Sequence, residues 1–196
     1  LCDGYTQLSC WGREENWTLP TAVCRQKDGG WLIGETAYAT ALAGEGSVTD
    51  KLIRLVLQDG SDTIYGVKYR AVDLLKCFLE QVFSLPLEEG KTVDGSMVKE
   101  LVITVPKMKA RLMDGLMYCA DQLKIPRSHV HVISHTEAFM YFVLSQTRDV
   151  WSNHVGLFDL SEKCLCYYEM KVQKNMGQVT AVAEREKLEE GFALDI

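Results

Sequence analysis

Three histidines in the second half of the chain have side chains suited to metal chemistry. His129 and His131 are two residues apart, and His135 follows four residues later. The alternation of a strand would place His129 and His131 on one face, as two zinc ligands would need. A structural zinc site takes four ligands, and no fourth ligand or carboxylate accompanies the three. We therefore expect no metal site, and we interpret the histidines as polar positions at a strand edge.

Other combinations of reactive side chains have simpler interpretations. Cys164 and Cys166 share one face of an expected strand, where they are typical of buried apolar positions rather than of a thiol pair. A catalytic triad could be drawn from Ser134, His154 and Asp159, but no nucleophile-elbow motif accompanies it. The glycine pairs at 29–30 and 44–46 indicate turns outside the strand-loop-helix context of a nucleotide loop.

Composition indicates a folded globular chain. The 196 residues are 47% hydrophobic and 24% charged, with a net charge of −6. The acidic balance gives no electrostatic reason to expect nucleic acid, and no apolar run approaches a membrane span. The start of the chain does not resemble a secretory signal. Seven scattered cysteines without a Cys-x-x-Cys pair argue against disulfides and favour a reducing, cytoplasmic location.

The first half of the sequence predicts a hairpin followed by helices. Strands are expected over 21–25 and 31–33, joined at Asp28-Gly29-Gly30, and Gly34 should open a helix over 36–43. Residues 51–57 form a short run of alternating apolar residues that ends at Asp59-Gly60. Apolar residues at helical spacing predict a helix over 71–85, and an exposed acidic loop should follow it.

The second half alternates between strands and helices. Strands are expected over 101–105, 129–133 and 155–160, and helices over 108–123 and 136–145, with Ser134 or Thr136 as N-cap of the latter. An antiparallel pair over 164–172 and 179–186 should close the chain. The strand-helix-strand-helix-strand order predicts an α/β fold, with a partly parallel, mixed sheet and covering helices.

This order, with short motifs inside it, resembles the actin, sugar-kinase and heat-shock-chaperone ATPase superfamily. The resemblance covers nearly the whole chain but only the first lobe of that fold. Residues 3–9 match the chaperones' opening turn in length, with Asp, Thr and Ser in register. Leu101 to Pro106 is similar to their Ile-Thr-Val-Pro strand. The other matching segments are residues 19–23, 32–37, 133–144 and 155–160.

The resemblance implies a ribonuclease-H-like, actin-type lobe with ATP and Mg between two lobes. It divides the chain into a core subdomain (1–27 and 98–160), an inserted subdomain (28–97) and the start of a second lobe (161–196). It also places Glu137 where related enzymes orient the attacking water, with His135 as the other register. The phosphate-contacting residues that it implies are Asp3, Thr6, Gln7, Ser9, Asp159 and Lys163.

Both implied phosphate loops depart from the family pattern. Phosphate loops need glycine because backbone N–H groups must approach the phosphate oxygens closely. Tyr5 stands in the register of the first loop's glycine, and residues 161–163 (Ser-Glu-Lys) replace three glycines in the second. Glu162 would repel a phosphate, although Lys163 could offset that repulsion. Glu137 also has a structural interpretation, because an acidic side chain in the first turn stabilises a helix.

We therefore expect a degenerate nucleotide-binding fold that serves as an interaction or scaffolding module of a larger protein. Its expected partner is another protein or the second lobe, with no nucleic acid and no membrane. The alternative is an active ATPase of the same superfamily. An unrelated small α/β binding domain is the third hypothesis, and it requires that the first hairpin lie away from the strand at 155–160.

Overall fold

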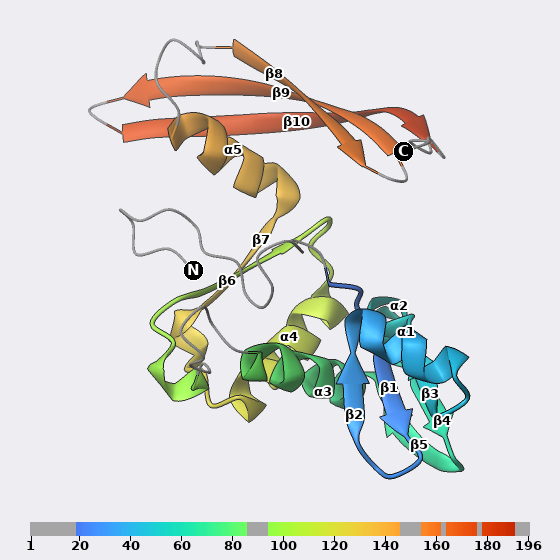
Figure 1. Cartoon of the computed structure of the whole chain (residues 1–196). Coiled ribbons are helices and arrows are strands. Elements are labelled where there is room, and N and C mark those ends of the chain that lie inside the picture. The colour runs from blue at the N-terminus through green and yellow to red at the C-terminus, as the bar shows by residue number, and fades with distance from the viewer. Residues whose placement is uncertain (1–18, 86–93, 146–153, 162–163, 176–177, 191–196) are drawn as a thin grey trace. The chain divides into compact units, whose positions relative to one another are not determined.

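A computed structural model of the chain describes residues 19–85, 94–145, 154–161, 164–175 and 178–190. These residues belong to two compact units, which Figure 1 shows together. The first unit comprises residues 1–102 and 109–131, and the second comprises 103–108 and 132–196. The chain is an α/β protein with several small sheets and helices. The subdomain boundaries expected from the resemblance stay predictions.

The first unit begins with a three-stranded antiparallel sheet. Strands β1 (Val23–Gln26) and β2 (Trp31–Ile33) form the predicted hairpin, with Cys24 opposite Leu32. Strand β3 (Gly46–Thr49), which the sequence did not predict, pairs with the other edge of β1. Helix α1 (Gly34–Leu42) lies against β1 and β3, and Ala37 is buried with Cys24 beneath it.

Gly34 begins α1 as predicted, and the backbone there requires glycine. Its φ of 63° lies in the left-handed region, which side chains with a Cβ rarely adopt. A Cβ at this position would also collide with the side chain of Leu19. The chain can therefore turn directly from β2 into α1 without a loop.

Residues 51–70 fold differently from the sequence expectation. The alternating apolar run is the short helix α2 (Leu52–Leu57), in which Leu52 and Val56 are buried. Strands β4 (Ser61–Ile64) and β5 (Val67–Arg70) then form a second antiparallel hairpin, with Ile64 opposite Val67. Tyr65 and Gly66 make its two-residue turn, and both have positive φ, as a type I′ turn requires.

Two long helices complete the first unit. Helices α3 (Ala71–Ser84) and α4 (Ala110–Gln122) agree with the predicted helices to within two residues and pack against each other. In α4, Leu112, Leu116 and Cys119 follow one another at helical spacing and are buried. In α3, Leu74, Leu75, Phe78 and Phe83 are buried, and Leu74 is fully so.

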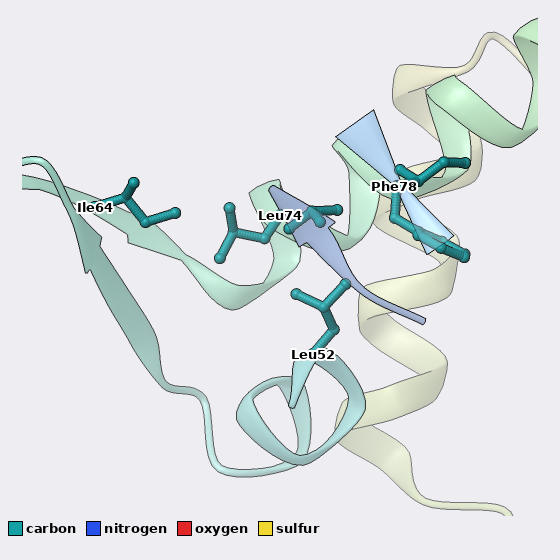
Figure 2. Close-up of a cluster of buried hydrophobic side chains, with 6 residues drawn as sticks. Leu52, Ile64, Leu74 and Phe78 are labelled. Atoms are coloured by element: carbon teal, nitrogen blue, oxygen red, sulfur yellow. The ribbon is translucent and has the colours of Figure 1, made fainter. Parts of the chain in front are cut away.

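The main core cluster of the first unit joins its sheets to its helices. Figure 2 shows Leu52 of α2, Ile64 of β4, and Leu74 and Phe78 of α3 pointing toward one another. Val23 and Ile33, from β1 and β2, complete the buried set. Because the set draws one or two residues from each element, these short strands and α2 are stabilised by shared burial rather than by their own length.

Strands β6 (Leu101–Val105) and β7 (Val130–Ser134) form a two-stranded sheet and are connected through α4 and the short 3₁₀ helix Arg127–His129. Another short 3₁₀ helix, Gly95–Met97, precedes β6. Two contacts beside these strands each span 31 residues, His129 to Val98 and His131 to Glu100. Both residues of the second contact lie two positions further along the chain than those of the first. The two segments therefore run in the same direction. This agrees with the strand-helix-strand unit expected from the sequence.

The second unit contains a three-stranded antiparallel sheet in the order β10-β9-β8. Its strands are β8 (His154–Ser161), β9 (Cys164–Asn175) and β10 (Gln178–Glu190), and helix α5 (His135–Ser145) packs beside β10. The predicted pair of final strands is confirmed, and both strands are longer than predicted. The described strands pair β8 with β9 rather than with β7, because adjacent strands with a tight connection pair most readily. A single mixed sheet is therefore not formed by the described strands alone.

Candidate functional site

Five of the residues implied by the family resemblance lie outside the described part of the chain. These are Asp3, Thr6, Gln7, Ser9 and Lys163. Asp159 lies in β8, opposite Cys166 of β9. The pairing of β8 with β9 continues to Ser161 and Cys164, so only residues 162 and 163 stand between the paired positions. The opening turn at residues 3–9, whose hairpin the third hypothesis places away from the strand at 155–160, also lies outside the described residues.

Glu137 has contacts with its own helix and with the residue that caps that helix. The Ser134 Oγ accepts a hydrogen bond from the Glu137 backbone N–H at 3.1 Å, so Ser134 is the N-cap of α5. The Tyr141 hydroxyl, one turn further on, donates to Glu137 Oε1 at 3.5 Å. Ser134 and Glu137 have the spacing of a capping box, which is a helix-starting arrangement. Of the two predicted N-caps, Ser134 is confirmed.

His129 and His131 each contact a different residue. His129 Nδ1 donates to the Val98 carbonyl oxygen at 3.0 Å, and His131 Nε2 donates to Glu100 at 2.6 Å. His135 is the first residue of α5. Within the described ranges, no three His, Cys, Asp or Glu side chains gather closely enough to hold a metal ion. The sequence did not pair His131 with Glu100, because the two residues are 31 positions apart.

A surface hollow of the first unit brings together residues that the sequence analysis did not single out. This α2–α4 hollow has a volume of about 420 Å³ and lies between α2, α3 and α4. Val56 and Val72 form its apolar part, together with Gly115. Its charged lining is Asp59, Arg111 and Asp114, and Tyr118 completes it. A second hollow of about 170 Å³ adjoins it at Val56, Asp59 and Val72 and includes Lys68 and Arg70.

Gly115 keeps the floor of the α2–α4 hollow open. A Cβ at this position would lie 3.0 Å from Val56 Cγ1 and 3.5 Å from Val72 Cγ1. The first distance is shorter than an ordinary carbon–carbon contact of about 3.5–4.0 Å. A glycine inside a helix costs about 1 kcal/mol relative to alanine, so its place in α4 has a packing reason. Glycine lets α4 approach α2 and α3 closely, with Val56 buried beneath the hollow and Val72 half-buried beside it.

Asp59 lies at the end of α2 in a conformation that favours glycine. The Gly60 N–H donates to the Leu55 carbonyl at 2.8 Å, and the Asp59 N–H donates to the Val56 carbonyl at 3.1 Å. These two bonds form a Schellman motif, with Asp59 at the left-handed position and a φ of 52°. Its carboxylate also stands at a helix C-terminus, where a positive charge is favoured. Asp59 is therefore less favourable for folding than Gly or Asn would be.

A network of three side chains fixes the wall beside the α2–α4 hollow. Arg70 makes two hydrogen bonds of 2.8 Å to Asp73, and the Tyr118 hydroxyl donates to the same carboxylate at 3.0 Å. The Arg70 guanidinium also lies over the Tyr118 ring, 5.7 Å from its centroid. The bond from Arg70 lowers the pKa of Asp73, and the bond to Asp73 raises the pKa of Tyr118. Arg70 is thus neutralised locally, and Tyr118 is held in one orientation.

Cys77 and Cys119 are unsuited to nucleophilic chemistry. Burial raises the pKa of Cys77 to about 11 and that of Cys119 to about 12, so both stay thiols near neutral pH. Cys119 also donates weakly to the Val72 carbonyl at 3.8 Å. The raised pKa values fit two cysteines that pack as small apolar side chains.

Comparison with known proteins identifies a family without a described activity. Residues 4–195 match the family described as "Family of unknown function (DUF5716) C-terminal". No curated protein matches the sequence. Among the helices in the described ranges, none is both long and apolar enough to cross a membrane. Function therefore has to be argued from the geometry of the chain itself.

Proposed function

The chain belongs to the DUF5716 C-terminal family, and we propose that it is an actin-like first lobe that acts as an interaction or scaffolding module rather than as an ATPase. The fold part of this proposal draws support from the order of elements. Strand β6, helix α4, strand β7, helix α5 and strand β8 follow one another as the resemblance requires. The common offset of the contacts beside β6 and β7 is also the one expected of parallel strands.

The surroundings of Glu137 are the observation that carries the non-catalytic part of the proposal. A residue that orients an attacking water needs a carboxylate directed at the substrate. The Glu137 carboxylate instead accepts a hydrogen bond from Tyr141 of the same helix, and its backbone N–H is held by Ser134. These contacts account for an acidic residue at this position through helix stability alone.

The two implied phosphate loops, which both depart from the family pattern, also argue against an ATPase. With only Glu162 and Lys163 between the paired ends of β8 and β9, the connection offers no glycine for close backbone approach to phosphate. Tyr5 in the first loop adds bulk at the corresponding glycine register. We therefore place the function of this module in its surfaces rather than in a nucleotide cleft.

Nucleotide binding by the full-length protein that contains this chain tests the proposal. We expect no heat of binding in calorimetry and no rise in melting temperature at millimolar ATP with Mg²⁺. Nucleotide bound at 100 times its dissociation constant would stabilise the protein by about 2.7 kcal/mol, which a thermal shift detects readily. Micromolar binding that an Asp159→Ala substitution abolishes would overturn the proposal and support an active ATPase.

A further inference from the structure

We propose that the α2–α4 hollow receives an arginine side chain of a partner polypeptide. This inference rests on the proposed role as an interaction module and names the chemistry of the partner. The hollow combines an apolar floor with two carboxylates, Asp59 and Asp114, that come from different elements. An arginine side chain has the complementary arrangement, with an apolar stem and a cationic head.

The floor matches the stem of an arginine. Val72, which is half-buried, presents aliphatic carbons, Val56 lies buried beneath the hollow, and Gly115 leaves the space that any larger residue would fill. All three positions are on helices that pack against one another, so the floor is set before a ligand arrives. A preformed apolar surface reduces the entropy lost when a flexible side chain is bound.

The carboxylates of Asp59 and Asp114 match the cationic head of an arginine. Asp114 is exposed, and it makes no ion pair or hydrogen bond with any residue in the described ranges. Arg111 Nη1 lies 3.9 Å from Asp59 Oδ2, which is an ion pair but too long for a hydrogen bond. Both carboxylates therefore keep capacity for new N–H donors. A guanidinium offers five such donors along several edges, so it can serve two carboxylates at once.

The conformation of Asp59 supports a role beyond folding. Its left-handed backbone and its place at a helix C-terminus both disfavour a carboxylate, and glycine or asparagine would suit the Schellman motif better. Residues kept in a locally unfavourable state are a starting point for functional hypotheses. In this protein, the unfavourable backbone conformation of Asp59 places its carboxylate at the rim of the α2–α4 hollow.

Neighbouring charges favour a cation in this hollow over an anion. Asp59 and Asp114 outnumber Arg111, which is the one basic residue lining it. Arg70 lies in the adjoining hollow and is already bound to Asp73. The side chain of Lys68, also in the adjoining hollow, makes no ion pair or hydrogen bond with the described residues, so it could receive an acidic neighbour of the bound arginine.

A methyl NMR titration of the full-length protein tests the inference directly. The probe is N-acetyl-arginine amide, and the methyl signals observed are those of Val56 and Val72. We expect saturable shifts with a dissociation constant of about 1 mM or weaker, because exposed ion pairs each contribute about 1 kcal/mol or less. N-acetyl-citrulline amide, which has the same shape without the charge, is the matched control and should cause no saturable shift. Equal shifts with both probes, or none with either, would overturn the inference.

Three substitutions make the test specific. Asp114→Asn should weaken binding of the arginine probe about threefold. Arg111→Gln should strengthen it about twofold, because a competing cation is removed. Asp59→Asn should weaken binding while keeping or raising the melting temperature, which separates lost binding from unfolding. Unchanged affinity in both aspartate variants would contradict the inference. Because no nucleotide is present, these results stand apart from the ATP experiment.

Discussion

Helices α3 and α5 are both rich in large apolar side chains, yet these lie in different surroundings. In α3, Phe78 and Phe83 are each 8% exposed. In α5, Tyr141 and Phe142 are 61% and 63% exposed. Helix α3 also has a polar face with Asp73, Lys76 and Glu80, whereas Glu137 is the single Asp, Glu, Lys or Arg in α5. Apolar composition thus indicates what a helix could bury, and its neighbours decide what it does bury.

The largest effect expected from this comparison comes from one substitution made in each helix. Phe78→Ala should reduce the free energy of unfolding by about 3–5 kcal/mol, because it leaves a cavity in the core of Figure 2. Phe142→Ala should cost about 1 kcal/mol or less, because that ring is mostly exposed. Urea unfolding of both variants measures the difference. An equally large loss for Phe142→Ala would mean that α5 is covered in the full-length protein.

A smaller effect is expected at the start of α5. Ser134→Ala removes the hydrogen bond to the Glu137 N–H and should cost about 1 kcal/mol. Thr136→Ala is the matched control, since Thr136 was the other predicted N-cap, and it should change stability little. Thermal unfolding of the two variants separates these roles. A greater loss for Thr136→Ala would show that the cap has been assigned to the wrong residue.

The smallest effect is expected in the side-chain network of α3 and α4. Tyr118→Phe should cost about 0.5–1 kcal/mol at neutral pH, because one hydrogen bond to Asp73 is lost. The raised pKa of Tyr118 means that its contribution is complete below its ordinary value of 10.0 and is lost as pH rises through the folded value. The lowered pKa of Asp73 adds stability above 3.8 that is lost as pH falls.

Unfolding measured from neutral pH to about pH 11 checks the alkaline part of this prediction. The unsubstituted protein should lose stability as pH rises above the ordinary Tyr118 pKa of 10.0, and the Tyr118→Phe variant should lose less over the same range. Identical pH profiles for the two proteins would show that the hydroxyl contributes nothing to the network.

The regular elements were predictable where their patterns were long. Helices α3 and α4 and strands β6 and β7 were found to within two residues, because helical spacing or a β-branched run extends over each. Helix α2 has six residues, too few for helical periodicity to be distinguished from alternation. The β4–β5 hairpin was missed because its turn is Tyr65-Gly66 rather than Asn-Gly, and because Ser61 and Asp62 are not typical strand residues.

The α2–α4 hollow could not be predicted from the sequence. Asp59 and Arg111 are far apart in the chain, and so are Asp73 and Tyr118. Local patterns show which face of a helix is apolar, but they do not show which helices meet. Asp59-Gly60 was interpreted as the end of an apolar run, which it is, and only the backbone bonds of α2 reveal the unfavourable position of the carboxylate. The site therefore depends on tertiary contacts.

The two histidine contacts near β6 and β7 have a consequence for how faithfully these strands align. A sheet whose strands slide by one residue turns every side chain to the wrong face. Here such a slide would break the bonds from His129 to Val98 and from His131 to Glu100 together, since both have the same offset. The two imidazoles thus stabilise the native register over a shifted one, and they do so through side-chain hydrogen bonds that add to those between the strand backbones.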